Sequence, residues 1–425
     1  MFSTERKSTD KLDRSYVLVF LYILLLIQDC LVKIGIPIMG FCDEAFSIVF
    51  ILVILLYLLK NNFLLQLTRY EIILMQLYFC FVLIGIVSNI INSNQTIPYV
   101  LLDILTSSKM FLAIVGAKII FSNGISFNVK NHLRIVTKTY IVILFVFAIH
   151  DWFSVPFFKV GHDNAMMGFS SKYLYLMYSN PTYLAAYAIA ALIVLIYTGE
   201  RKNIWTYIFM DATVIILTTR SKAWGFLCLA FLIYWISNKA SSTKSVWKRM
   251  VVIFPIAFAT LLLVAMDKII IYFFTPSHYS PRAILLNEGI ALAKELFPLG
   301  NGFGTFCSVA AITTNKGTGL LPHNNTAYYD AFWACISGQF GIFGIIIFVA
   351  MVIVILCEIM SLSKYNRRAW YVAVLALSYL VIASLGETSF FAQYSVLFGI
   401  VIGACCTCKR TSDSGVNNEK DFSFK

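Results

Sequence analysis

The sequence predicts an all-α, polytopic membrane protein with about twelve transmembrane helices and one large outer loop. Hydrophobic residues make up 60% of the 425-residue chain and charged residues only 13%. The mean hydropathy of +0.81 is far too high for a soluble globular domain. Apolar runs of about 20 residues, the length that crosses the hydrocarbon core as a helix, recur along the chain. One long segment, 274–330, interrupts them and is too polar to lie in lipid.

Each apolar run is interpreted as a helix, because only helices and closed barrels satisfy their backbone hydrogen bonds in lipid. Arg220 and Lys222 divide two of the runs with almost no loop between them. The predicted spans lie at residues 15–38, 44–60, 71–92, 98–121, 133–152, 181–198, 203–219, 222–238, 249–273, 331–359, 369–386 and 389–407.

The distribution of basic residues predicts the orientation. Cytoplasmic segments of membrane proteins are enriched in Lys and Arg, and most of the 33 basic residues fall into inner segments when the N-terminus is cytoplasmic. Both termini are therefore expected inside, and the first span, which no cleavage site follows, is expected to stay as an anchor. The predicted order is a cytoplasmic N-terminus (1–14), nine helices (15–273), the outer loop (274–330), three helices (331–407) and a disordered cytoplasmic tail (408–425).

Composition also bounds the partners and cofactors. The formal net charge of +12 is explained by the inner segments, so we expect a lipid bilayer and no nucleic acid as partner. Cys405 and Cys408 form a C-x-x-C pair, but no second pair and no histidine lies near them, so no metal site and no cofactor is predicted.

Two arginines fall on the outer side, against the charge bias. Arg220 lies beside Lys222 in the break between two spans, and Arg282 opens a helix of the large loop. A guanidinium offers a fixed fork of donors that matches phosphate oxygens, and it stays charged at any relevant pH. Interfacial snorkelling or an ion pair with a nearby acid is the structural alternative. The pattern favours a site for an anionic substrate.

The large loop has its own local order. Ser280 and Pro281 predict the start of a helix that ends before Pro298. Its apolar residues are predicted to form one stripe on the membrane surface, made of Ile284, Leu285, Leu292 and Leu296.

A glycine-rich turn follows this helix. Gly300, Gly302 and Gly304 have G-x-G-x-G spacing, which lets backbone amides turn toward one point and form an anion-binding nest. The alternative is a turn that only shapes the loop. The spacing does not match the dinucleotide-binding fingerprint.

The end of the loop brings polar and aromatic residues to the outer end of the span at 331–359. They are His323, Asn324, Tyr328 and Asp330. A histidine with its ordinary pKa of about 6.5 can take a proton from a hydroxyl or hydrogen-bond a phosphate. For the tyrosine, an aromatic belt at the membrane surface is the structural alternative.

Four charged residues fall within predicted spans: Asp29, Lys33, Asp103 and Lys109. Charges are costly in lipid, so these side chains should face the bundle interior or pair with each other. Lys33 follows Asp29 by four residues, which predicts an ion pair between them.

Four motifs, taken in order, resemble the bacterial O-antigen and capsular polysaccharide polymerases of the Wzy type. They are SNPTYLAAY (179–187), TTRSKAWGF (218–226), SPRAILLNEGIALAKELFPLGNGFGTF (280–306) and HNNTAYYDAFWACISGQFGIFG (323–344). O-antigen ligases share the pattern. The resemblance covers about residues 179–355, whereas the first half matches only as a series of spans.

The resemblance implies a glycosyltransferase of GT-C-like fold in the bacterial inner membrane, with the large loop in the periplasm. Such an enzyme transfers a growing glycan from undecaprenyl pyrophosphate onto the non-reducing end of a lipid-linked repeat unit. A Wzz-type chain-length regulator and a Wzx-type flippase are the implied protein partners. The family's Ser-Arg motif falls on Thr219-Arg220, where threonine keeps the hydroxyl, and the ligase-like His-Asn pair falls on His323-Asn324.

These expectations combine in one mechanism. Arg220 and Arg282 would stabilise the negative charge of the leaving pyrophosphate, with Lys222, the three glycines, Asn324 and Tyr328 as further substrate contacts. His323 is the first candidate base for the acceptor hydroxyl, and Glu288 or Asp330 are the next.

Other functions remain open on the sequence alone. An O-antigen ligase would share the donor chemistry. A lipid-linked oligosaccharide flippase would more often show internal repeats and short outer loops, and the long outer loop argues against it. In a non-catalytic scaffold the outward arginines would have no role.

Overall fold

The structure is a computed structural model that describes residues 16–60, 68–92, 95–122, 125–158, 160–162, 172–198, 204–239, 281–308, 310–311 and 331–407. Its elements in chain order are α1 (Tyr16–Lys33), the 3₁₀ helix η1 (Pro37–Phe41), α2 (Cys42–Lys60), α3 (Arg69–Asn92), α4 (Ile97–Ile120), α5 (Phe127–Phe153), β1 (Val160–His162), β2 (Lys172–Leu174), α6 (Pro181–Thr198), α7 (Ile204–Leu217), α8 (Ser221–Lys239), α10 (Pro281–Glu295), α12 (Phe332–Leu362), α13 (Arg367–Ser384) and α14 (Ser395–Cys406).

The described chain is a bundle of apolar helices, as the sequence predicts. Eight helices are long and apolar enough to cross a membrane, and three shorter apolar helices accompany them within the described ranges. Every predicted span that falls on described residues corresponds to a helix, whereas the span at 249–273 lies outside them. The protein therefore has the character of a multi-pass membrane protein.

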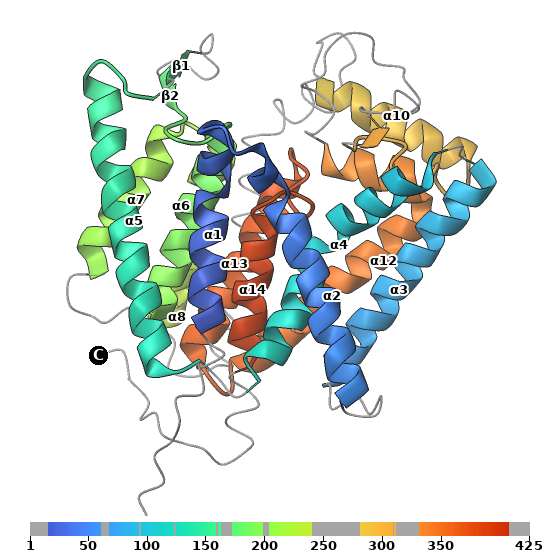
Figure 1. Ribbon diagram of the computed structural model, residues 1–425, viewed down its shortest axis with the longest axis horizontal. Helices are drawn as coiled ribbons and strands as arrows, with labels where there is room; N and C mark the ends of the chain where they lie inside the picture. The colour runs from blue at the N-terminus through green and yellow to red at the C-terminus, as the bar shows by residue number, and fades with distance from the viewer. Residues whose placement is uncertain are drawn as a thin grey trace, which may run out of the picture.

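The helices alternate in direction, so the bundle has two distinct ends (Figure 1). One end carries η1, the short strands and α10, and is called the loop end below. Contacts between distant segments define it. Lys33 donates to the Tyr178 carbonyl, Asn92 donates to the Gly300 carbonyl at 3.0 Å, and Lys222 pairs with Glu387 at 2.7 Å.

A small antiparallel hairpin at the loop end was not predicted from the sequence. Strand β1 pairs with β2 so that Gly161 lies opposite Tyr173. Each strand has only three residues, which is too short for an alternating pattern to stand out from the surrounding loop. The hairpin matters because it brings β2 to the turn between α7 and α8.

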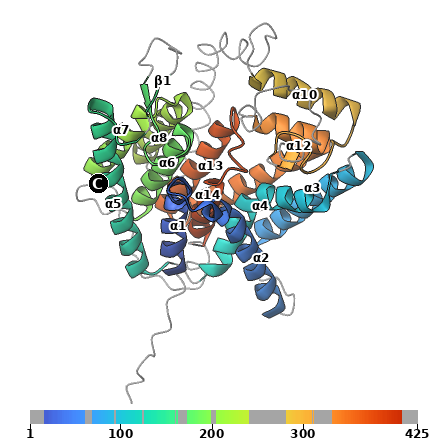
Figure 2. The same ribbon diagram turned by 45° about the horizontal axis from the view of Figure 1, so that its top comes forward.

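Helix α4 lies in the middle of the bundle and contacts α14 closely (Figure 2). Gly399 and Gly403 of α14 have G-x-x-x-G spacing and face Ala113 and Ala117 of α4. A Cβ added at Gly403 would lie 2.5 Å from the Ile114 carbonyl oxygen. Small residues allow this approach, and lipid-embedded helices associate through such packing rather than through a hydrophobic driving force.

The central position of α4 buries its two lysines. Lys109 forms ion pairs with Asp43 and with Glu44, the latter at 2.7 Å, and these three residues are called the Lys109 cluster. Nearer the opposite end, Lys118 pairs with Glu358 and lies 3.7 Å from Glu71, which defines the Lys118 cluster.

The prediction that the charges within the spans face the interior is confirmed for Asp29, Asp103 and Lys109, whereas Lys33 is exposed. Lys109 is 2% exposed and Asp103 is 7% exposed. Asp29 and Lys33 both anchor the segment that precedes α6. Asp29 accepts hydrogen bonds from the amide and hydroxyl of Ser179, and Lys33 binds the Tyr178 carbonyl. Instead of the predicted ion pair with each other, Asp29 and Lys33 bind neighbouring residues of the segment before α6.

Helix α12 is interrupted at Gly341, whose φ of 61° and ψ of −158° are not helical. The break interrupts the backbone ladder, and the loop after α10 supplies donors in its place. The Asn301 amide donates to the Gly338 carbonyl at 2.9 Å, and the Gly302 amide donates to the Gln339 carbonyl at 2.7 Å. Irregular backbone is tolerated at membrane depth only where the protein satisfies it in this way.

Helix α10 forms as predicted from Pro281, but Leu285 of the expected surface stripe does not face a membrane surface. Leu285 is only 1% exposed, because α10 packs against the first part of α12 (Figure 1). At Gly289 an added Cβ would meet the Ala334 carbonyl at 2.6 Å. A glycine on this face lets the two helices approach, so Leu285 is covered by protein.

Gly341→Ala should lower the free energy of unfolding by about 3 kcal/mol or more, since it adds backbone strain and a steric clash. The new Cβ would lie 2.5 Å from the Leu299 carbonyl. The measurement is the thermal unfolding midpoint of the purified protein in detergent. Gly225→Ala in α8 is the matched control, because nothing lies within 4 Å of its added Cβ. Equal midpoints for the two variants would contradict the role of the break.

Candidate functional site at the loop end

Arg220 lies in the tight turn between α7 and α8. The preceding residue, Thr219, has a φ of 54°, an unusual value for a β-branched side chain, of the kind that often marks a constrained or functional position. The guanidinium carbon of Arg220 lies 5.2 Å from the ring centroid of Tyr173 on β2, in the range of a cation–π contact. Its Nε is buried, and no acceptor in the described part of the chain bonds to it. Arg220 is therefore held by a ring, and its Nε lacks an acceptor among the described residues.

Lys222 is arranged differently, although it lies only two residues away. Its ammonium pairs with Glu387 at 2.7 Å, and the other oxygen of Glu387 accepts a hydrogen bond from the Tyr394 hydroxyl at 3.0 Å. The charge of Lys222 is thus largely compensated. An anionic ligand at Lys222 would have to compete with Glu387.

The glycine-rich turn is fixed through its own backbone to α12, as described above, and to α3 and α4. Asn89 of α3 brackets Phe303, accepting from its amide at 2.7 Å and donating to its carbonyl at 2.9 Å. The Gly304 amide donates to Asp103 of α4 at 2.7 Å. Gln95 donates to the Gly304 carbonyl at 2.6 Å. The turn is consequently a rigid part of the bundle.

These contacts bear on the predicted anion nest. The amides of residues 301–304 all have protein acceptors, so an anion would have to compete for them. The glycines are also needed for conformation and space. Gly302 and Gly304 have φ values of 92° and 72°, and a Cβ at Gly300 would lie 2.4 Å from the Gln339 backbone. The geometry gives the three glycines a role in shaping the loop.

The other predicted site residues lie on or after α10. Arg282 is in the first turn of this helix. Glu288 is half-buried, and burial raises the pKa of its carboxyl above the ordinary value of 4.5. The remaining predicted residues, His323, Asn324, Tyr328 and Asp330, fall outside the described residues.

Sequence reasoning missed several residues of this end. Tyr173 and Glu387, which hold Arg220 and Lys222, come from short segments that looked like plain loops. Asn89 gave no signal because a single amide in an apolar helix fits many roles. Asp43 and Glu44 at the start of α2 could have indicated a charged cluster, since paired acids beside a span are unusual.

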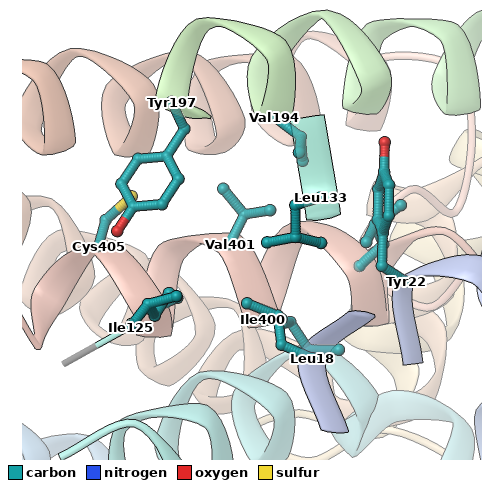
Figure 3. Close-up of a pocket in the computed structure, with 11 residues that line it drawn as sticks. Leu18, Tyr22, Ile125, Leu133, Val194, Tyr197, Ile400, Val401 and Cys405 are labelled. Atoms are coloured by element: carbon teal, nitrogen blue, oxygen red, sulfur yellow. The ribbon is translucent and has the colours of Figure 1, made fainter. Parts of the chain in front are cut away.

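A small pocket elsewhere in the bundle has a different character (Figure 3). It is lined almost entirely by apolar side chains of α1, α5, α6 and α14, among them Leu18, Leu133 and Val401. The Tyr22 hydroxyl is bonded to Thr137 at 3.0 Å. The pocket offers no charged group, so the loop end remains the candidate site. Within the described ranges, no group of three or more His, Cys, Asp or Glu residues could hold a metal ion.

No family model matches the chain, and a search of the curated proteins finds no match. The fold itself defines a class, that of a multi-pass helical membrane protein. One end of its bundle carries the partly buried Arg220.

Asp103→Leu should release the glycine-rich turn, because it removes the charged acceptor of the Gly304 amide. Hydrogen bonds to charged groups contribute about 1.5–3 kcal/mol, so this amide should exchange hydrogen roughly tenfold faster or more. Hydrogen exchange read by mass spectrometry on the peptide around residue 304 tests this. Asp211→Leu is the control, because Asp211 is fully buried and neither carboxyl oxygen bonds to any described residue. The prediction is wrong if both variants exchange alike.

The stability of the protein should depend on pH through Glu288. The raised pKa means that the folded protein keeps a proton that the unfolded chain has already lost. The contribution of Glu288 to the stability of the folded protein should therefore be greatest below pH 4.5. This contribution should fall as the pH rises through the pKa of the carboxyl in the folded protein. Glu288→Gln cannot ionise, so its unfolding midpoint should fall less over this window. Thermal unfolding at a series of pH values measures both slopes, and equal slopes would argue against a buried carboxyl.

Proposed function

We propose that the protein is a membrane glycosyltransferase of the Wzy polymerase type. In this proposal it transfers a growing glycan from undecaprenyl pyrophosphate to the non-reducing end of a lipid-linked repeat unit. The observation that carries the proposal is Arg220, a permanent cation at the loop end with a buried donor that no described residue uses. The four sequence motifs of residues 179–344 support the same class.

The chemistry requires a group that stabilises a departing pyrophosphate. When the bond between the anomeric carbon and the phosphate oxygen breaks, its electron pair stays on that oxygen. A preorganised cation in apolar surroundings stabilises this charge more strongly than water does. Tyr173 holds the guanidinium through its ring, a contact that leaves the planar fork of donors free for phosphate oxygens.

The other charged groups have different roles in the proposed reaction. Lys222 contributes positive potential while Glu387 fixes its position. Arg282, in the first turn of α10, is the second proposed pyrophosphate ligand. For the base that takes the acceptor proton, we propose Glu288, a half-buried carboxyl whose pKa is raised by burial. His323 and Asp330 are the alternative bases.

The distribution of charge supports an outward-facing loop end. Basic residues gather at the opposite end of the helices, where the positive-inside rule expects the cytoplasm. They include Lys60, Arg69, Lys130, Arg134, Lys364, Arg367 and Arg368. We accordingly propose a bacterial inner-membrane location with both termini cytoplasmic, and function alongside a flippase and a chain-length regulator.

Deleting the gene in its host and separating the surface glycan on a gel tests the function. A polymerase is indicated when only a single repeat unit reaches the surface. Long chains that stay unattached would instead indicate a ligase, and loss of all capped lipid would indicate a flippase. Either of the last two results would overturn the proposed reaction.

Arg220→Lys should abolish most polymer formation, by about 100-fold or more, because the charge remains while the fork of donors is lost. The assay is polymer length and amount in the deletion strain complemented with each variant. Arg69→Lys makes the same change at the other end of the bundle and should leave the polymer unchanged. Full-length polymer from a well-folded Arg220→Lys protein would count against the role of Arg220.

A further inference from the structure

The Lys109 and Lys118 clusters have the same composition, one lysine and two carboxylates, but their oxygens are satisfied differently. In the Lys118 cluster, Glu71 also accepts the Thr68 amide at 2.5 Å. As far as the described residues go, neither Glu71 nor Glu358 has a buried oxygen without a hydrogen-bond partner. The Lys109 cluster does have one. Oxygen Oε2 of Glu44 is buried and receives no donor from the described chain.

Two glutamines next to the Lys109 cluster also have a buried side-chain oxygen that receives no hydrogen bond from the described chain. Gln28 of α1 is 0% exposed and donates to Asp43 Oδ1 at 2.8 Å and to the Gly40 carbonyl at 3.3 Å. Gln393, just before α14, donates to the same Gly40 carbonyl at 3.4 Å. The side-chain oxygen of each glutamine is buried and has no donor among the described residues. Three acceptor oxygens around this cluster therefore need a partner.

The orientation of both amides is fixed by their neighbours. Turning the Gln28 amide over would place its oxygen against the Asp43 carboxylate and the Gly40 carbonyl. Turning Gln393 over would place its oxygen against the same carbonyl. Acceptor-to-acceptor contacts of this kind are unfavourable. The unpartnered atoms are thus oxygens, and what they lack is a donor or a cation.

Charge and space narrow the choice of ligand. The carboxyls of Asp43 and Glu44 lie within hydrogen-bond reach of each other. They carry two formal negative charges and Lys109 carries one positive charge, so a largely buried charge of −1 remains when both acids are ionised. An uncompensated buried charge is strongly unfavourable. The three oxygens are closed to solvent. Because Lys109 already compensates one of the two carboxylates, a monovalent cation would balance the remaining charge, whereas a divalent cation would exceed it.

We propose that the Lys109 cluster, together with Gln28 and Gln393, binds one hard monovalent cation through oxygen ligands. Carboxylate and amide oxygens are ligands that hard cations prefer. The ion would join α1, α2 and the start of α14 to the central helix α4. The site does not depend on the reaction proposed above, so it is tested without a glycan substrate.

The test is equilibrium binding of ²²Na⁺ to the purified full-length protein in detergent. We expect saturable binding of about one ion per chain, with competition by unlabelled sodium, lithium or potassium giving the preference. Gln28→Leu removes one ligand oxygen without changing the charge, and it should weaken binding at least tenfold. Glu71→Gln in the Lys118 cluster is the matched control and should bind like the wild type.

Folding is checked by thermal unfolding of each variant. If Gln28→Leu does not fold, Gln393→Leu takes its place, because it removes another unpartnered oxygen at a less buried residue. No saturable binding to the folded wild type would overturn the proposal, and so would unchanged binding in a folded glutamine variant. If the protein takes up a proton but no ²²Na⁺, the cluster is a protonated carboxyl pair and the cation site is wrong.

Discussion

The close contact between α4 and α14 is the interaction on which the rest of the bundle depends. Gly399 and Gly403 let α14 approach the backbone of α4 near Met110 and Ile114. In hydrocarbon there is no hydrophobic driving force between two apolar helices, so they associate mainly through close van der Waals packing. With α14 on one side and α2 on another, α4 is enclosed by protein. That enclosure makes Lys109 and Lys118 interior residues and explains why acids meet them from three neighbouring helices.

The same requirement, that polar groups be satisfied inside the protein, explains the loop end. The break at Gly341 would leave carbonyls of α12 without partners, and amides of the glycine-rich turn supply them. In return, Asn89 and Asp103 hold the other amides of that turn. Helix α10 is therefore attached on both sides, through its packing on α12 and through the turn that follows it. A loop segment bound in this way can position side chains as firmly as a helix does.

The sequence predicted the parts of the fold that depend on local composition. Span positions follow from the length and hydropathy of each run, and the start of α10 follows from Pro281. The pairing of Lys222 with Glu387 joins residues far apart in sequence, and local pattern says nothing about such pairs. The prediction that Leu285 faces a membrane surface was wrong for a related reason. An apolar helical face predicts burial, but whether lipid or another helix covers it depends on tertiary packing.

Arg220 differs in its partner from three lysines of the described chain, and Lys138, which lies 4.9 Å from the ring centroid of Tyr207, is a further cation that contacts a ring. Lys109, Lys118 and Lys222 each meet a carboxylate, and removing one partner of a buried pair typically costs about 3–5 kcal/mol. Such lysines hold helices together, and an incoming anion would have to displace an acid of the protein. Arg220 rests on the ring of Tyr173 instead. A cation–π contact orients a guanidinium without neutralising it, so an anion that reaches Arg220 gains the full charge and displaces no carboxylate. This difference in partners, more than the number of basic residues, is why we propose the turn between α7 and α8 as the phosphate site.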